Sequence, residues 1–129
     1  MTNEFEKKLV LSSLGHTWIF DLDGTVVKHN GYKIDGEDTL LCGAEEFLKS
    51  IPEKDMVIFL TSRTEEYRTQ TEKFLAEKKI RYDAIIFNAP LGERILLNDT
   101  KPQGLTTALA IPRRRDFWDK LQTTEDENL

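Results

Sequence analysis

The most constraining feature of this 129-residue chain is the sequence Asp-Leu-Asp-Gly-Thr at residues 21–25, which directly follows an apolar run at residues 18–20. If this run is a β-strand, both acids lie at its carboxyl end, where open α/β sheets bind ligands. Two such carboxylates can hold a hard cation and attack an electrophile, and Gly24 permits a sharp turn because it has no Cβ atom. An ordinary Asp/Gly surface turn is the alternative. Residues elsewhere in the chain are needed to distinguish a binding site from such a turn.

The length and composition indicate a single globular domain. A chain of 129 residues with 39% hydrophobic and 32% charged residues is typical of a soluble domain. No apolar run approaches the ~20 residues that a membrane helix needs, no signal-peptide pattern opens the chain, and the one cysteine leaves no internal disulfide. We therefore expect a cytoplasmic protein without a membrane partner, with one domain over residues 1–122 and a polar tail over residues 123–129 that frays.

The charge argues against a protein that coats nucleic acid. The formal net charge is −5 and the isoelectric point is near 5.1, whereas nucleic-acid binding usually needs a broad basic face. The one basic cluster is Arg113, Arg114 and Arg115. Three such charges can hold a phosphate or a carboxylate, although a run of this kind is more often a solvated surface. A nucleic-acid partner is therefore not the first expectation.

The apolar pattern predicts strands that alternate with helices. The predicted elements are, in order, a helix at 5–14, a strand at 17–21, a flap or hairpin at 26–41, a helix at 44–51, a strand at 56–60, a helix opened by the Ser-x-x-Glu cap of residues 62–65, strands at 84–87 and 94–97, and a weaker strand at 106–111. Alternation of this kind predicts an α/β fold with a mainly parallel sheet and helices on its faces.

Three of the predicted strands end in polar groups. The first ends in Asp21 and Asp23, the second in the Thr-Ser-Arg sequence of residues 61–63, and the fourth in Asn98 and Asp99. Each group taken alone has an ordinary explanation as a cap or a turn. In a parallel sheet, however, all three would meet at the same edge, and this convergence favours a functional site.

These three groups, in this order, resemble the motifs of the haloacid dehalogenase (HAD) superfamily. The resemblance spans about residues 18–102 and implies a Rossmann-like, three-layer αβα sandwich with a mainly parallel sheet. Many members carry a cap domain, but about 35 residues separate Thr25 from Thr61, and a helix and a strand fill residues 64–92. We therefore expect a member without a cap domain, and hence an open site.

The resemblance implies a phosphatase that works through an aspartyl-phosphate intermediate. Asp21 would be the nucleophile, and Asp23 would protonate the leaving alcohol and then activate water. Mg²⁺ would be held by Asp21, by Asp99 and by the backbone carbonyl of Asp23, because Mg²⁺ prefers oxygen ligands. Thr61 and the neighbouring Ser62 would bind the phosphoryl oxygens, aided by the amides that follow them.

Several assignments remain open at this stage. The family places a cation before its last motif, and Arg94 is the first candidate for this phosphate-binding role, with Lys101 as the second. Asn98 stands where many members have an acid, so it contacts either the metal or the substrate. Arg63 and His29 are further candidates for substrate contacts, although a solvated loop histidine is the more common case for His29.

The expected activity is therefore a Mg²⁺-dependent phosphomonoesterase. The segment 92–102 is similar to small HAD proteins without a cap domain that belong to surface-polysaccharide biosynthesis, which favours a small sugar or polyol phosphate as substrate. An open site also permits a macromolecular substrate, such as a nucleic-acid end or a phosphoprotein, and a homo-oligomer could supply a lid. A different class of protein, a signalling module phosphorylated on an aspartate, is the remaining alternative.

Overall fold

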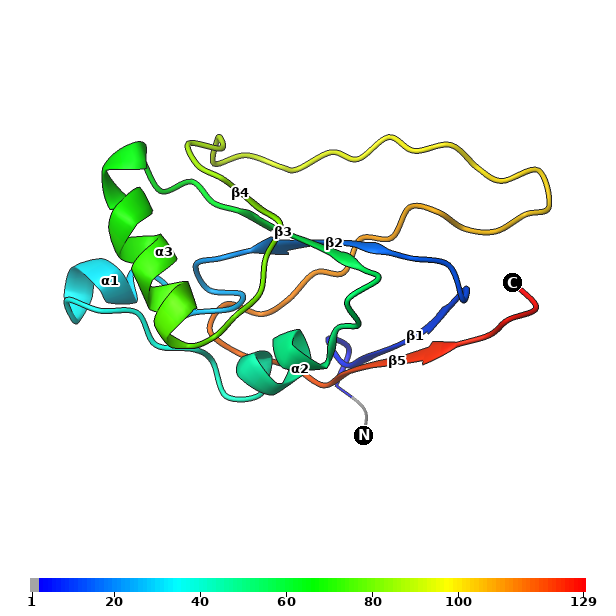
Figure 1. Cartoon of the computed structure of the whole chain (residues 1–129), viewed down its shortest axis with the longest axis horizontal. Coiled ribbons are helices and arrows are strands. Elements are labelled where there is room, and N and C mark those ends of the chain that lie inside the picture. The colour runs from blue at the N-terminus through cyan, green and yellow to red at the C-terminus, as the bar shows by residue number, and fades with distance from the viewer. Residues whose placement is uncertain (1–2) are drawn as a thin grey trace.

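The computed structural model describes residues 3–129, and Figure 1 shows its elements along the chain. These elements are β1 (Lys7–Leu11), β2 (Thr17–Asp21), α1 (Gly31–Ile34), α2 (Ala44–Ser50), β3 (Met56–Leu60), the 3₁₀ turn η1 (Glu65–Tyr67), α3 (Arg68–Glu77), β4 (Ala84–Ile86) and β5 (Leu121–Glu125). The predicted strands at 17–21 and 56–60 are confirmed to the residue, and the predicted strand at 84–87 and helix at 44–51 to within one residue.

The central sheet is parallel and has the strand order β2-β3-β4. Side chains alternate across a strand, and the register places Phe20 beside Phe59. These two rings and Val57 are buried on one face of the sheet. The other face is largely uncovered, since Ile19 is 54% exposed and Ile86 is 51% exposed. The apolar runs therefore form parallel strands as predicted, but one face lacks the cover expected for a three-layer sandwich.

Two helices close the covered face of the core. Leu48 of α2 and Leu75 of α3 are buried in the same hydrophobic cluster as Phe59. Helical spacing was the correct signal here, because it places apolar residues on one side of each helix. The predicted Ser-x-x-Glu cap is wrong: the turn η1 starts after Thr64, and no side chain caps it.

A second, two-stranded sheet corrects two predictions at the chain ends. Residues predicted as a helix form β1, which pairs in parallel with β5 from Lys7 beside Leu121 to Leu11 beside Glu125. Leu9 and Leu11 are the half-buried positions of β1 while Val10 is exposed, which is a strand periodicity. Local spacing could not reveal this pairing, because the two strands lie more than a hundred residues apart in sequence. The tail is therefore paired as far as Glu125 rather than frayed from residue 123.

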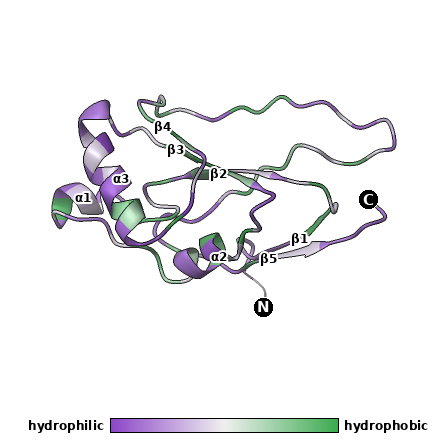
Figure 2. Cartoon of the chain, in the orientation of Figure 1, coloured by the Kyte–Doolittle hydropathy of each residue, from purple (hydrophilic) through white to green (hydrophobic). Residues whose placement is uncertain are grey.

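The predicted strands at 94–97 and 106–111 are wrong. Residues 88–120 contain no helix or strand, and their first part is a long exposed loop that runs out along the sheet and returns (Figure 1). Figure 2 shows hydrophobic residues along this loop, and Ile95 and Leu97 are 82% and 85% exposed. A short apolar run becomes a strand only when a neighbouring strand pairs with it. Here the Asn98 amide instead donates to the carbonyl of Thr107 across the loop, at 2.8 Å.

The fold is thus a mixed α/β structure with parallel sheets, which confirms the predicted fold class but not the three-layer sandwich. Because β2 and β3 are parallel neighbours, Asp21 at the end of β2 lies beside Leu60 at the end of β3. The residues that follow both strands therefore share one edge of the sheet. Within residues 3–129, no helix is long and apolar enough to cross a membrane.

The central core predicts a strong effect of truncating Phe59, which is fully buried. Phe59→Ala should lower the free energy of unfolding by about 3–5 kcal/mol, because it removes apolar contacts and leaves a cavity. Ile34→Ala is the control, since Ile34 is 70% exposed and its change should stay within about 0.5 kcal/mol. Urea unfolding followed by circular dichroism measures both, and equal losses would contradict this description of the core.

Candidate functional site

The turn after β2 orients the first carboxylate. The backbone N–H groups of Thr25, Val26 and Val27 donate to the carbonyl of Leu22, and Gly24 has a φ of 82°, which strains any residue with a Cβ atom. The Thr25 hydroxyl donates to Asp21 Oδ2 at 3.1 Å. The side chain of Asp21 is 36% exposed, so its carboxylate is held in place but remains open to a ligand.

The second carboxylate belongs to a buried ion cluster centred on Arg63. Its Nε and Nη2 donate to the two oxygens of Asp23 at 3.1 and 2.9 Å. Its Nη1 and Nη2 donate to the two oxygens of Asp38 at 3.0 and 2.7 Å, and Nη1 also donates to the hydroxyl of Thr71 at 2.9 Å. A guanidinium has five N–H groups, and these five bonds use all of them.

The environment of Arg63 corrects its predicted role. The side chain is 1% exposed, and Tyr32 of the flap covers it, with the ring centre 3.9 Å from the guanidinium carbon. Burial lowers the pKa of Arg63, but the hydrogen bonds to Asp38 and Asp23 outweigh this effect and hold the pKa above its usual value. Arg63 has no donor left for a substrate. It fixes Asp23 instead, and it ties the flap to the sheet through Asp38.

The end of β3 places Thr61 beside this cluster. Thr61 is fully buried, its hydroxyl accepts from the backbone N–H of Arg63 at 3.1 Å, and it lies 3.5 Å from Asp23 Oδ2. Ser62 is partly exposed at the same edge. Both predicted phosphate-binding residues therefore lie at the carboxyl end of β3. The hydroxyl of Thr61, however, is directed toward Asp23 and the backbone of Arg63.

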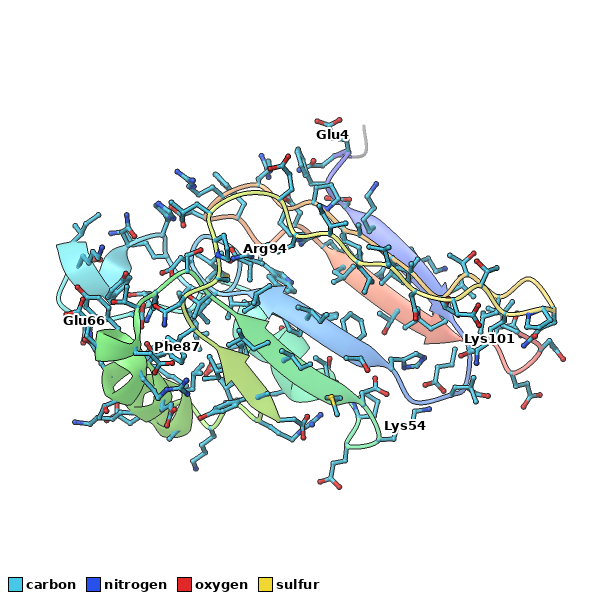
Figure 3. The ribbon with its side chains drawn as sticks, turned by 90° about the horizontal axis from the view of Figure 1, so that it is seen from above. Glu4, Lys54, Glu66, Phe87, Arg94 and Lys101 are labelled. Atoms are coloured by element: carbon cyan, nitrogen blue, oxygen red, sulfur yellow. The ribbon has the colours of Figure 1, made fainter. Side chains whose placement is uncertain are left out.

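Arg94 is the cation that the structure brings to the first carboxylate. Its Nη1 donates to Asp21 Oδ1 at 2.9 Å, and its side chain is 36% exposed. Figure 3 shows Arg94 above the carboxyl end of β2, whereas Lys101 lies far away, at the outer end of the loop. Of the two cations considered from the sequence, only Arg94 reaches the site in this arrangement.

The other predicted residues of the last motif are not brought to this edge. Asn98 and Asp99 both bond to Thr107 across the loop, the first through its side chain and the second through its backbone carbonyl. Among residues 3–129, no three His, Cys, Asp or Glu side chains form a group that could hold a metal ion. As arranged here, the residues do not fit a Mg²⁺ site, because Asp99 is absent from it and Arg63 occupies both oxygens of Asp23.

A segment that the sequence analysis left unassigned contacts the motif turn. The backbone N–H of Asp116 donates to the carbonyl of Gly24 at 2.8 Å, and Asp116 Oδ1 accepts from the backbone N–H of His29 at 2.7 Å. His29 is thus anchored by its backbone, and its ring Nδ1 is buried without a partner among the described residues. No local sequence pattern indicates this contact or the role of Asp38, because both are long-range pairings of ordinary loop residues.

The cluster predicts that two aspartates of the same flap differ sharply in importance. Asp38→Ala should destabilise the protein by about 3–5 kcal/mol, because it leaves the buried Arg63 with too few acceptors. Asp35→Ala is the matched control: Asp35 pairs with Lys28 in solvent, with 44% and 39% of the two side chains exposed, and such pairs contribute about 0–1 kcal/mol. Chemical denaturation compares them, and similar losses would show that Asp38 does not anchor the flap.

Comparison with known proteins finds similarity to solved structures alone. No protein-family model matches the chain, and no curated protein matches it. A chain of the Pnkp1/Rnl/Hen1 complex is 32% identical, with a TM-score of 0.50, over 64% of this chain and 31% of that chain. A chain of the Pnkp1/Rnl/Hen1 RNA repair complex is 29% identical, with a TM-score of 0.51, over 73% of this chain and 32% of that chain. This chain therefore spans about a third of the length of the chains it matches.

Proposed function

We propose that this chain is a HAD-type phosphatase that hydrolyses a phosphomonoester at the carboxyl edge of its central sheet. The observation that carries the proposal is the contrast between two neighbouring acids. Asp21 is half-exposed beside a cation, whereas Asp23 is held by a buried guanidinium. An accessible acid can serve as a nucleophile, and a fixed one can move a proton at a defined place.

In the proposed reaction, a carboxylate oxygen of Asp21 forms a bond to phosphorus while the bond from phosphorus to the ester oxygen breaks. The proton for the departing oxygen comes from Asp23 in its protonated form. Both oxygens of Asp23 accept hydrogen bonds from Arg63, so one of these bonds must break before Asp23 can carry that proton. Asp23 then takes a proton from the water that attacks the aspartyl-phosphate, which frees phosphate and restores Asp21. Arg94, already against Asp21, neutralises the charge of the phosphoryl oxygens, as arginines do in phosphoryl transfer.

The similarity to the RNA repair complex chains supports a phosphorylated nucleic-acid end as the substrate. One of those chains belongs to a structure described as an RNA repair complex, and the site has no cap domain within the described chain to exclude a strand. The second candidate is a small sugar or polyol phosphate. It is favoured by the acidic net charge of −5 and by the likeness of residues 92–102 to small polysaccharide-biosynthesis proteins.

Substitution of the two acids tests the chemistry. Asp21→Asn should abolish release of phosphate from an aryl phosphate and from a phosphorylated trinucleotide, because the nucleophile is lost. Asp23→Asn should lower kcat about 10²–10⁴-fold, the usual contribution of a general acid or base. Phosphate release is measured by a colorimetric assay, with the fold of each variant checked by circular dichroism. Full activity of Asp21→Asn would rule out the covalent route.

The family resemblance predicts a Mg²⁺ requirement, whereas the described arrangement of the acids does not form a Mg²⁺ site. An activity assay with and without Mg²⁺ decides between them. The resemblance predicts that EDTA abolishes activity and that Mg²⁺ restores it. In the described arrangement Asp99 lies outside the site, so a reduced apparent affinity of Asp99→Asn for Mg²⁺ would show that the loop carries Asp99 to Asp21 in solution. The control is Asp35→Asn, which changes an exposed acid in the flap and should leave the Mg²⁺ titration unchanged. Activity that survives EDTA would make the metal prediction wrong and leave Arg94 as the source of positive charge.

A further inference from the structure

The segment of residues 113–116 is fixed against the turn that carries the two acids. Asp116 bonds to Gly24 and to His29 through two hydrogen bonds of 2.8 and 2.7 Å. The Cγ atom of Arg115 lies 3.2 Å from where a Cβ on Gly24 would stand. Arg115 is therefore placed on the motif turn by backbone contacts on its neighbour, rather than by the chance position of a flexible side chain.

The three consecutive arginines are not equivalent. Arg113 donates to the carbonyl of Phe5 at 3.0 Å and lies over the ring of Trp118. Arg114 pairs with Asp119 at 2.6 Å. Both side chains are thus engaged by protein groups, Arg113 near the N-terminus and Arg114 at Asp119. Arg115 is exposed and takes part in none of the ion pairs or side-chain hydrogen bonds found for residues 3–129.

The other cations around the turn are already engaged. All five N–H groups of Arg63 donate to protein acceptors, and Lys28 pairs with Asp35 at 2.8 Å. Arg94 pairs with Asp21, the residue at which phosphate would react. Among the cations that residues 3–129 place around this turn, Arg115 is therefore the one without an ion pair. It lies against Gly24, which follows Asp21 by three residues. Its place suits a second negative charge of the substrate, next to the phosphate that is hydrolysed.

We propose that Arg115 binds a second phosphate group of the substrate, and that this group is the phosphodiester adjoining a phosphorylated strand end. The inference rests on the proposed function and specifies its substrate class. A guanidinium binds phosphate oxygens with two N–H groups in a fixed geometry. One such contact gives selectivity for a strand end over a single phosphomonoester without requiring a basic face across the protein.

The test compares Arg115→Gln with Lys78→Gln, which removes the same charge from an exposed lysine at the end of α3. A helix that follows a strand of a parallel sheet runs back toward the amino ends of the strands, so Lys78 lies away from the carboxyl edge. The substrates are an aryl phosphate, a nucleoside monophosphate, a nucleoside 3′,5′-bisphosphate, and a trinucleotide phosphorylated at its 3′ or 5′ end. Arg115→Gln should lower kcat/KM for the trinucleotide about tenfold, with kcat/KM for the aryl phosphate and the monophosphate unchanged.

A second measurement separates this proposal from the proposed function. Binding of the fluorescent, phosphorylated trinucleotide to Asp21→Asn, with and without Arg115→Gln, is followed by anisotropy across salt concentrations. Loss of Arg115 should weaken binding and reduce the salt slope by about 1, the value for one phosphate contact. This result would hold even if phosphatase activity were absent. Equal effects of the two variants on every substrate would overturn the proposal, and an effect confined to the bisphosphate would overturn the assignment to a strand.

Discussion

The interaction on which the site depends is the saturation of one buried guanidinium. Arg63 follows β3, Asp23 follows β2, Asp38 belongs to the flap and Thr71 to α3, so a single side chain joins four segments. Burying these charges is costly, and the cluster is tolerable because every donor of Arg63 has an acceptor. The cluster therefore holds the side chain of Asp23 in one orientation. It also holds the flap, whose Tyr32 lies over Arg63.

This cluster also explains why the two acids of one motif differ. Side chains two residues apart normally share a face of a strand, but the strand ends at Asp21 and the chain turns at Gly24. Asp21 is thereby left at the open edge with Arg94 and Thr25, while Asp23 turns toward Arg63. Because of the turn, the two acids of the motif lie in different environments, one accessible and one enclosed. Acids in different environments can take different chemical roles.

The sequence predicted the central sheet and the position of the motif because both depend on local patterns. The runs that became β2 and β3 are apolar and bounded by turn residues, and a parallel pairing then brings Asp21 and Thr61 to the same edge. Where the prediction was wrong, the missing information was long-range. Leu9 and Leu11 fit a helix or a strand until β5 supplies a partner. Residues 94–97 have a strand composition, yet they lie in an exposed loop, and Asp99 therefore stays away from Asp21.

For the proposed substrate, net charge is a weak criterion for a related physical reason. A value of −5 describes the whole surface, whereas charges in solution interact appreciably only within about 8–10 Å at physiological salt. Near the motif turn, Asp23 and Asp38 share the single charge of Arg63, Asp21 pairs with Arg94, and Arg115 lies against Gly24 without an ion pair. Asp116, next to Arg115, uses its carboxylate to accept the backbone N–H of His29. An acidic protein repels nucleic acid over most of its surface, so the proposed strand end would be held by one directed contact with Arg115 and not by a basic face. That combination favours recognition of a strand end over binding along a strand.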